Sequence, residues 1–319
     1  MTADMLHTLV LSAGDHMLLA QLTRGGLVES WHRGVATLTG PDGKVIEHWG
    51  PSKRIIYPRS AVKPLQAVAV RRAGLSLAGA QLAVSSGSHS GSTEHVTLVE
   101  QILAQAGLGV EALQCPLAWP ANSAARTAAT EQRREYFNCS GKHAAFLAAS
   151  VGAGWSTHDY LSAEHPLQKL IVDVLEEFSG EKVLHTTVDG CGAPLHTLTV
   201  EGLARATGKF ALEETEIAAG LKANGWAIGD REAADSLMLD AGLVAKVGAE
   251  GVYVVGTSDG HGLAIKIADG SMRAMAAVAV AILAKHELIS ADAAAELGAK
   301  VTPRVLGGAT DVGRLDVMI

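Results

Sequence analysis

The sequence has few cysteines, no long uninterrupted hydrophobic run and no lysine or arginine among its first ten positions. Three cysteines, Cys115, Cys139 and Cys191, occur in 319 residues, and a low, odd count is typical of a reducing compartment, so we expect a cytoplasmic protein. No stretch reaches the roughly 18 uninterrupted apolar residues that suggest a membrane-spanning helix. Asp15 and His16 break the apolar stretches near the N-terminus, so we also expect no secretory signal.

Basic residues are also in short supply. The formal net charge is −7, with 26 lysines and arginines against 33 acidic residues. Nucleic acids and anionic membranes select basic surfaces, so we expect neither as a partner. The apolar content is 48%, and a chain of this length can bury roughly three quarters of its unfolded surface. The composition therefore predicts a globular protein with a large core.

Both ends of the sequence predict antiparallel strands. Asp42-Gly43 and Asp259-Gly260 are typical hairpin turns, and each stands between β-rich segments. These segments are 18–23, 34–39 and 45–49 in the N-terminal part, and 252–255 and 263–267 near the C-terminus.

The middle of the sequence predicts helices. Helical periodicity appears at 93–105, 144–151, 168–178, 200–206, 213–223 and 231–239, and again at 272–286. A doubly wound parallel sheet would need strands and helices to alternate throughout, and they do not. We therefore predict a mixed α/β (α+β) fold in a single domain over 1–319. Its antiparallel sheet lobe comes from about 1–60 and 245–319 and its helical lobe from about 61–244, with a ligand cleft between them.

The segment Arg59-Ser60-Ala61-Val62-Lys63-Pro64 carries a Ser-x-x-Lys motif. Residues three apart share a face of a helix, so the hydroxyl of Ser60 and the amine of Lys63 can meet. A neutral lysine can then remove the serine proton and create a nucleophile, as in serine acyl-transfer enzymes. Pro64 suits the first turn of a helix, which predicts that Ser60 lies near a helix N-terminus, where a developing anion is favoured.

A Ser/Gly-rich segment, Ser85-Ser86-Gly87-Ser88-His89-Ser90-Gly91, follows the apolar run 82–84. We interpret the apolar run as a strand and the polar segment as a turn, a place where functional residues often collect. The segment in isolation is typical of a flexible polar loop. The alternative is a hydroxyl relay beside Ser60.

Two cysteines stand in polar surroundings. Asn138-Cys139-Ser140-Gly141-Lys142-His143 opens a predicted helix, and Cys191 lies in the segment Asp189-Gly190-Cys191-Gly192. Cysteines brought together can bind zinc, although isolated cysteines are more often inert and buried.

Lys266 interrupts an apolar strand. Alternation places it on the opposite face from its neighbours Ile265 and Ile267. The simplest interpretation is a solvent-facing lysine at a sheet edge. The alternative points Lys266 into the cleft, where a second cation would lower the pKa of Lys63.

Seven segments, taken in order, resemble the bacterial asparaginase II family, the Rhizobium etli type of L-asparaginase. They are Arg24-Gly25-Gly26-Leu27-Val28-Glu29-Ser30, Arg59-Ser60-Ala61-Val62-Lys63-Pro64-Leu65-Gln66, Ser88-His89-Ser90-Gly91, Asn138-Cys139-Ser140-Gly141-Lys142-His143, His165-Pro166-Leu167-Gln168, Asp189-Gly190-Cys191 and Lys266 in its Ile-Lys-Ile strand. The family often has a glutamate where this sequence has Ser92. The resemblance leaves Ser90, Ser92 and Cys115 without roles.

The resemblance implies a homodimeric enzyme that hydrolyses L-asparagine to L-aspartate and ammonia, with a fold similar to that of serine β-lactamases and glutaminases. It implies two catalytic Ser–Lys tandems, Ser60 with Lys63 and Ser88 with Lys266. It also implies one zinc ion that tunes substrate binding. Its ligands would be Cys139, Lys142 and Cys191, and it would lie near Asp189 and His143.

The function predicted from the sequence is thus an asparaginase that works through an acyl-enzyme on Ser60. Arg59 and Asp189 are predicted to hold the α-carboxylate and α-ammonium ends of the substrate, with His143 beside them. One alternative is a related serine amidohydrolase acting on glutamine or a β-lactam. The other is a non-enzymatic zinc or redox protein built on Cys139 and Cys191, which leaves both Ser–Lys pairs unexplained.

Overall fold

The structure is a computed structural model that describes residues 8–319. The chain forms two compact units. A sheet unit contains the chain up to Ala61 together with Thr197–Leu212 and Ala241–Ile319. A helical unit contains Val62–His196 and Glu213–Asp240. Residues 1–7, on which the expectation of no secretory leader partly rests, lie outside the described residues.

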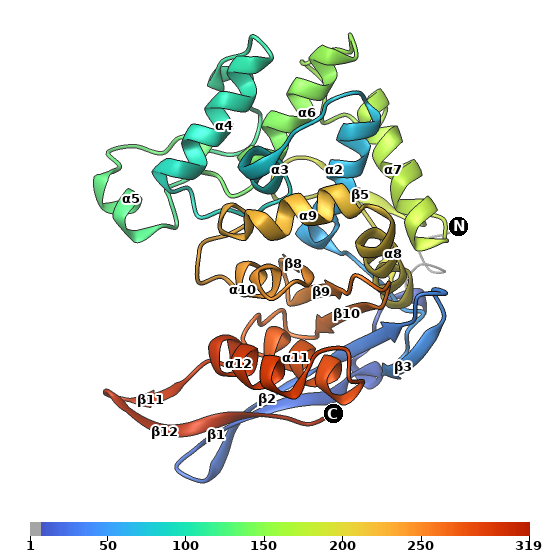
Figure 1. Cartoon of the computed structure of the whole chain (residues 1–319), viewed down its shortest axis with the longest axis vertical. Coiled ribbons are helices and arrows are strands. Elements are labelled where there is room, and N and C mark those ends of the chain that lie inside the picture. Colours follow the sequence, from blue (N-terminus) through green and yellow to red (C-terminus); the bar gives the residue numbers. More distant parts are fainter. Residues whose placement is uncertain (1–7) are drawn as a thin grey trace. The chain divides into compact units, whose positions relative to one another are not determined.

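The sheet unit is built on an eight-stranded antiparallel sheet (Figure 1). Along the sheet the strand order is β11-β12-β1-β2-β10-β9-β8, and β3 also pairs with β2. The N-terminal strands are β1 (Met17–Arg24), β2 (Leu27–Thr39) and β3 (Val45–Trp49). The C-terminal strands are β8 (Val244–Gly248), β9 (Val252–Gly256), β10 (Gly262–Ile267), β11 (Val305–Gly307) and β12 (Thr310–Val317). Strands from both ends of the chain therefore share one antiparallel sheet, which confirms the predicted fold class.

The long strand β2 joins the two groups of strands. It pairs with β1 over its first half and with β10 over its second half, where Val35 lies opposite Lys266. A Cβ atom at Gly34 would lie 2.3 Å from the carbonyl oxygen of Lys266, so only glycine fits where β2 meets the end of β10. Because β10 lies between β2 and β9, the interpretation of Lys266 as a residue of a sheet edge is wrong.

Three longer helices complete the sheet unit: α8 (Val200–Glu213), α11 (Met275–Lys285) and α12 (Ala291–Val301). The apolar helix α11 packs on β9 and β10, and its residues 275–280 are all buried. A two-residue strand, β4 (Ile55–Ile56), pairs with β7 (Leu198–Thr199) just before the chain reaches Ser60. Residues 197–212, predicted within the helical lobe, thus group with the sheet.

The helical unit is arranged around α6 (Ser140–Gly152), which is buried from Ser140 to Ser150. In Figure 1, α2, α3, α4 and α7 surround it. The helices of this unit are α2 (Lys63–Arg72), α3 (Gly79–Ser85), α4 (Thr93–Gln105), α5 (Ser123–Ala128), α7 (Pro166–Ser179), α9 (Thr215–Ala223) and α10 (Ala234–Asp240). A small hairpin of β5 (Thr186–Val188) and β6 (Pro194–His196) also belongs to it.

One predicted strand is wrong. The apolar run 82–84 belongs to α3 and not to a strand. Its consecutive residues Leu82, Ala83 and Val84 are all buried, because α3 packs against α4, α6 and α9. A helix covered on several sides has no polar stripe, so its apolar run cannot be distinguished from a buried strand by periodicity.

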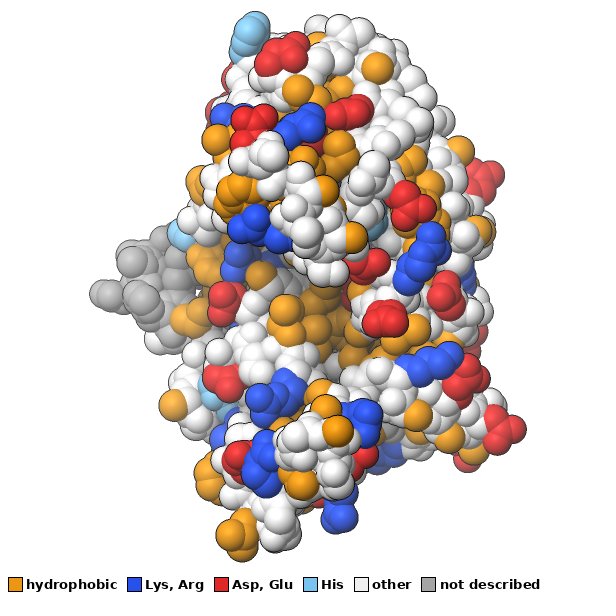
Figure 2. All heavy atoms as spheres, turned by 90° about the vertical axis from the view of Figure 1, so that its left-hand side faces the viewer, with side chains coloured by type: hydrophobic (Ala, Val, Ile, Leu, Met, Phe, Trp, Pro, Cys, Tyr) orange, Lys and Arg blue, Asp and Glu red, His pale blue; other side chains and the backbone are white. Residues whose placement is uncertain are grey.

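Within residues 8–319, no helix combines the length and the apolar character needed to cross a membrane. On the face shown in Figure 2, basic, acidic and hydrophobic side chains are interspersed. Several of the basic side chains are paired with acidic ones. In the sheet unit, Arg304, which directly precedes β11, forms an ion pair of 2.8 Å with Asp311 of β12.

Candidate active site

The Ser-x-x-Lys segment lies at the start of α2. A single 3-10 turn, Arg59–Val62, carries Ser60, and α2 then begins at Lys63 with Pro64 in its first turn. The ring of Pro64 fits there because the first N–H groups of a helix have no helical acceptor. This confirms the predicted helix start. The Ser60 side chain is half-buried, whereas Lys63 is only 1% exposed.

Within the helical unit, the amine of Lys63 meets the Ser/Gly-rich loop. Its Nζ donates a hydrogen bond to the carbonyl oxygen of Gly87 and lies 3.2 Å from Oγ of Ser88. Sequence reasoning paired Ser60 with Lys63 and Ser88 with Lys266. The structure brings Lys63 and Ser88 together, two residues that stand 25 positions apart in the chain.

Backbone hydrogen bonds hold the loop that carries Ser88. Its N–H donates to the carbonyl of Ile228 at 2.6 Å, and the N–H of Ser90 donates to that of Gly229 at 3.0 Å. Gly87 must be a glycine, because a Cβ atom there would lie 2.6 Å from the carbonyl oxygen of Ile228. The loop expected to be flexible is therefore tightly packed, and it places Ser88 in a defined position.

His89 joins this loop to the start of α6. Its Nδ1 accepts the N–H of Gly91 at 3.2 Å, so Nε2 carries the proton and faces the Ser140 hydroxyl at 3.0 Å. Ser140 in turn donates to the carbonyl of Glu135 at 3.0 Å. Burial, with smaller effects of His95 and Lys63, holds the pKa of His89 well below its ordinary value. A neutral His89 thus connects Ser88 to the helix that presents Cys139 and Lys142.

Cys139 and Cys191 lie close together in the helical unit. Cys139 directly precedes α6, and Cys191 lies in the turn between β5 and β6. Nζ of Lys142 is 3.1 Å from Sγ of Cys191, and Sγ of Cys191 is 3.8 Å from a carboxylate oxygen of Asp189. The structure thus clusters four of the predicted metal and substrate residues.

The cluster favours a thiolate on Cys139. A hydrogen bond from Cys191, together with the charges of Lys63 and Lys142, holds the pKa of Cys139 well below its ordinary value. The same hydrogen bond and burial raise the pKa of Cys191. Burial alone would lower the pKa of Lys142, but the neighbouring sulfurs and Asp189 raise it. The third cysteine differs, because burial raises the pKa of Cys115 to about 12.

The donor set of the cluster fits zinc only if a lysine takes part. Among residues 8–319, no group of three or more His, Cys, Asp or Glu side chains could hold a metal ion. Cys139 and Cys191 supply two sulfur donors, and Lys142 lies within hydrogen-bond distance of one of them. Two thiolates and one neutral amine give nitrogen and sulfur ligands of the kind that zinc prefers. A metal would have to displace the proton of Lys142.

His143 lies one turn into α6, beside Lys142. Tyr160 accepts the N–H of Gln114 at 3.0 Å, and its hydroxyl lies 2.8 Å from Nδ1 of His143. The tyrosine hydroxyl still has its own proton to donate, and when it donates to Nδ1 the imidazole proton lies on Nε2. Nε2 is buried and has no hydrogen-bond partner among residues 8–319. Burial, with the charges of Lys142 and Lys63, holds the pKa of His143 well below its ordinary value. His143 thus presents a neutral, unused donor.

Arg59 and Lys266 line one pocket of the sheet unit, with a volume of about 350 Å³. Nζ of Lys266 is 2.6 Å from the carbonyl oxygens of Glu250 and of Ile267. Burial lowers the pKa of Lys266, and Arg59 adds to this effect while Glu250 opposes it. Arg59 and Glu250 also have φ angles of 53° and 63°. Left-handed backbone at two non-glycine residues of one pocket is typical of a functional site.

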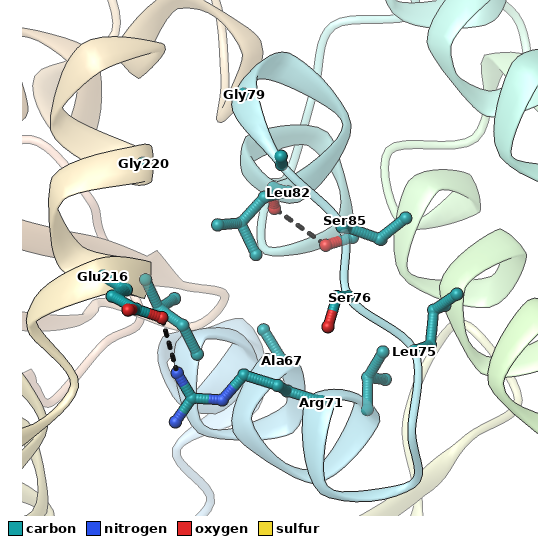
Figure 3. Close-up of a pocket in the computed structure, with 13 residues that line it drawn as sticks. Ala67, Arg71, Leu75, Ser76, Gly79, Leu82, Ser85, Glu216 and Gly220 are labelled. Carbon is teal, nitrogen blue, oxygen red and sulfur yellow. Dashed lines mark hydrogen bonds and ion pairs between the residues drawn. The ribbon is translucent and has the colours of Figure 1, made fainter.

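A separate cavity of about 290 Å³ opens between α2, α3 and α9 in the helical unit (Figure 3). Its wall is mostly apolar, and Arg71 lies at its edge, 4.0 Å from Glu216. None of the predicted site residues lines it. The cavity is therefore distinct from the Lys63–Ser88 pair.

Sequence reasoning missed the residues that support the predicted ones. Tyr160 and Asp230 lie in no recognisable motif, whereas Gly87 lies in the Ser/Gly-rich segment. The role of each depends on contacts between distant segments. The signal for Gly87 was present in the Ser-Ser-Gly run, where a glycine indicates a close backbone approach. Nothing in the sequence singles out Tyr160.

The comparison with protein families covers nearly the whole chain. The model of the L-asparaginase II family matches residues 20–317. No curated protein matches the sequence. Among solved structures, Mglu in its glutamate form has a TM-score of 0.49 and 13% identity, over 81% of this chain and 61% of that one. Mglu in its native form has a TM-score of 0.44 and 13% identity, over 80% and 64%.

A β-lactamase from Mycobacterium bovis is also similar, with a TM-score of 0.36 and 17% identity, over 79% of this chain and 94% of that one. The chain spans less than two thirds of the length of either Mglu structure. At TM-scores this low, the structural matches carry no argument about the site.

Proposed function

The chain belongs to the L-asparaginase II family, and from this premise we propose that it hydrolyses the side-chain amide of L-asparagine to L-aspartate and ammonia. Membership of the family supports an amidohydrolase. The observation that carries the proposal is the contact between Lys63 and Ser88, which lie 3.2 Å apart in the helical unit. A buried lysine beside a serine is an arrangement that activates a hydroxyl for acyl transfer.

In the proposed reaction, Lys63 acts as the general base, a role for which it must first give up its own proton. It removes the proton of the Ser60 hydroxyl, and Oγ forms a bond to the amide carbon of the substrate. The C–N bond then breaks, the departing nitrogen takes a proton, and ammonia leaves. Water hydrolyses the ester on Ser60 and releases aspartate. Backbone N–H groups near the start of α2 stabilise the oxyanion, at about 3 kcal/mol for each donor.

Ser88 and Lys266 complete the proposed proton path. Since Lys63 faces Ser88, the simplest role of Ser88 is to pass the proton from Lys63 to the leaving nitrogen. Burial beside Arg59 lowers the pKa of Lys266, which favours its use as a proton carrier. The contact between Lys63 and Ser88 also makes Ser88 the second candidate for the nucleophile.

In this proposal, Arg59, Asp189 and His143 recognise the amino-acid part of the substrate. Arg59 would hold the α-carboxylate and Asp189 the α-ammonium group. The unpartnered Nε2–H of His143 would donate a hydrogen bond to a substrate oxygen. A ligand without an oxygen at this place would leave the buried imidazole of His143 unpaired, and this penalty supports selectivity for a small amino-acid amide.

We also propose that Cys139, Lys142 and Cys191 hold one zinc ion. Zinc bound there would supply a positive charge that orients the substrate. The test is a zinc assay on purified protein, in which wild type contains about one equivalent and Cys139→Ala contains little. The buried Cys115→Ala serves as the control and should retain the metal. Equal metal content in wild type and Cys139→Ala would remove this assignment.

The proposed function is tested by measuring ammonia release from L-asparagine and L-glutamine, with Ser60→Ala and Ser88→Ala as variants. Release from asparagine that disappears in Ser60→Ala, with the fold intact, supports the proposal. Activity lost only in Ser88→Ala would move the nucleophile to Ser88. A preference for glutamine would indicate the related amidohydrolase, and no release from either amide would favour the non-enzymatic alternative.

A further inference from the structure

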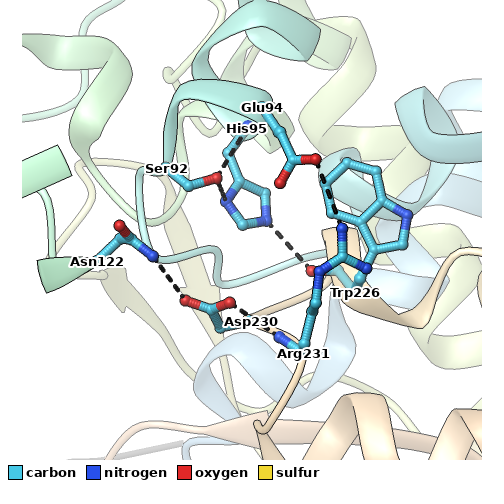
Figure 4. Close-up of polar contacts among 7 residues, drawn as sticks. All are labelled: Ser92, Glu94, His95, Asn122, Trp226, Asp230 and Arg231. Atoms are coloured by element: carbon cyan, nitrogen blue, oxygen red, sulfur yellow. Dashed lines mark hydrogen bonds and ion pairs between the residues drawn. The ribbon is translucent and has the colours of Figure 1, made fainter. Parts of the chain in front are cut away.

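Asp230 ties together three separate segments of the helical unit. Its Oδ2 accepts a hydrogen bond from Oγ of Ser90 at 2.9 Å and from Nδ2 of Asn122 at 3.2 Å. Its Oδ1 accepts the backbone N–H of Arg231 at 2.9 Å. Figure 4 shows the Asp230 carboxylate turned toward Asn122, while the Arg231 side chain extends toward Glu94. Asp230 is thus bound by neutral donors.

Every polar group of Ser90 is engaged in the same junction. Its carbonyl accepts the N–H groups of Ala121 and Asn122, both at 2.8 Å, and its own N–H donates to the carbonyl of Gly229 at 3.0 Å. The hydroxyl of Ser90 completes the set by donating to Asp230. A serine held at three points by two other segments has little freedom to shift, so Ser90 fixes the end of its loop.

The hydrogen bonds of the junction favour a negatively charged Asp230 carboxylate. Burial would raise the pKa of Asp230, but the N–H of Arg231 and the side chains of Asn122 and Ser90 lower it. The residue is only half-buried, so solvent also favours its charged form. An ionised carboxylate accepts hydrogen bonds more strongly than a neutral group does, and it remains ionised throughout the neutral range.

Ser88 lies two residues before Ser90, and both are held by the same partner segment. The N–H of Ser88 donates to Ile228 and that of Ser90 to Gly229, and Asp230 follows directly. Displacement of Ser90 would therefore move Ser88 relative to Lys63. We propose that Asp230, acting through Ser90, is a positioning residue that sets the Ser88 hydroxyl against Lys63. This inference rests on the proposed function and gives Ser90 a role.

The histidines beside the junction reinforce this position without being part of it. His95 stacks on His89 with ring centroids 5.1 Å apart. Nε2 of His95 lies 3.3 Å from the carbonyl oxygen of Trp226. Ser92 caps the N-terminus of α4, and its Oγ lies 2.8 Å from Nδ1 of His95 (Figure 4). These contacts place the 226–230 segment against α4. Among these contacts, it is the hydrogen bond of Asp230 that joins this segment directly to the Ser90 side chain.

The test is a double-mutant cycle on ammonia release from L-asparagine. Asp230→Ala and Ser90→Ala should each lower kcat by at least about tenfold with KM changed by less than about threefold. The double variant should be no worse than the weaker single variant, because both remove the same contact. Asp230→Asn keeps the side-chain size and one acceptor oxygen, so it should retain part of the activity. The matched control is Glu94→Gln, on the exposed pair with Arg231, and it should behave as wild type.

Three outcomes would overturn the inference. Losses that multiply in the double variant would show that Asp230 does not act through Ser90. A raised KM with kcat retained would place Asp230 in substrate binding. Unchanged kcat in Asp230→Ala and Asp230→Asn would remove its role altogether.

Amide hydrogen exchange separates this inference from the proposed function. The N–H groups of Ser88 and Ser90 are hydrogen-bonded, and they should exchange slowly in wild type and faster in Asp230→Ala. Wild type that releases no ammonia from any amide would overturn the proposed function, while the exchange result would still show whether Asp230 holds the loop. Unchanged exchange in the variant would reject the junction even in an active enzyme.

Discussion

Nζ of Lys63 and Oγ of Ser88 lie 3.2 Å apart, although 25 positions separate the two residues in the chain. The same amine also donates to the carbonyl of Gly87. Lys63 stands at the start of α2, and Ser88 stands in the loop after α3. The pair therefore depends on how these two helices pack. In the proposed reaction, this contact links the general base to a second hydroxyl.

Replacement of Lys63 by methionine should abolish ammonia release while the fold remains. Methionine fills a similar buried volume but cannot accept a proton, and loss of a general base typically costs about 10²–10⁴-fold in rate. Steady-state kcat for asparagine is the measurement. Lys169→Met is the control, because Lys169 lies on the surface in an ion pair with Glu164. A Lys63→Met variant that turns over at the wild-type rate would rule out Lys63 as the base.

Gly87→Ala should lower both stability and activity. The added Cβ would lie 2.6 Å from the carbonyl oxygen of Ile228 and 3.0 Å from that of Ala227. Relief of that overlap must move the loop, at about 1–3 kcal/mol of unfolding free energy. Urea unfolding and ammonia release measure the two effects. At Gly152, at the end of α6, nothing lies within 4 Å of an added Cβ, so Gly152→Ala should leave both unchanged or slightly raise stability.

Acid should destabilise the protein through its buried histidines. Burial lowers the pKa of His89, His95 and His196, so the unfolded chain binds more protons than the folded one below about pH 6.5. Their contribution to stability is present above that pH and is lost as the pH falls toward the lowered folded values. Each such histidine adds a slope of about 1.4 kcal/mol per pH unit.

The slope is measured by urea unfolding at several pH values between about 5.5 and 7.5. His196→Gln should reduce the slope by roughly one proton, because His196 no longer distinguishes the two states. His158→Gln is the control, since His158 is exposed, and it should leave the slope unchanged. Unfolding free energies that do not depend on pH in wild type would contradict the linkage.

Tyr160→Phe should release the fixed tautomer of His143. The tyrosine hydroxyl lies 2.8 Å from Nδ1 and also accepts the N–H of Gln114. Without it, the proton can occupy either ring nitrogen, and ammonia release should fall by about 10–100-fold, as for other orienting contacts of site histidines. Nitrogen-15 NMR of the imidazole reports the tautomer directly. Tyr136→Phe is the control, because the ring of Tyr136 contacts Arg133, and it should leave the His143 signals in place.

The sequence alone predicted most of the fold. Hairpin turns at Asp42-Gly43 and Asp259-Gly260 located the strands that became β2, β3, β9 and β10. Helical periodicity identified α4 with its bounds, and Pro64 identified the start of α2. These signals are local, because turn residues and amphipathic faces are set by neighbours in the chain. The strands β11 and β12 near the C-terminus were missed, and the buried helix α3 was mistaken for a strand.

The sequence by itself determined the residue types of the candidate site: a Ser-x-x-Lys segment, a Ser/Gly-rich loop, and cysteines beside a lysine and a histidine. Only the tertiary structure decided which of them meet. It joined Lys63 to Ser88 and Cys191 to Lys142, and it placed Lys266 on backbone carbonyls beside Arg59. The physical reason is that a motif identifies functional side chains only at positions close together in the sequence. A contact between distant segments follows from the packing of whole helices and strands, on which any one motif has little influence.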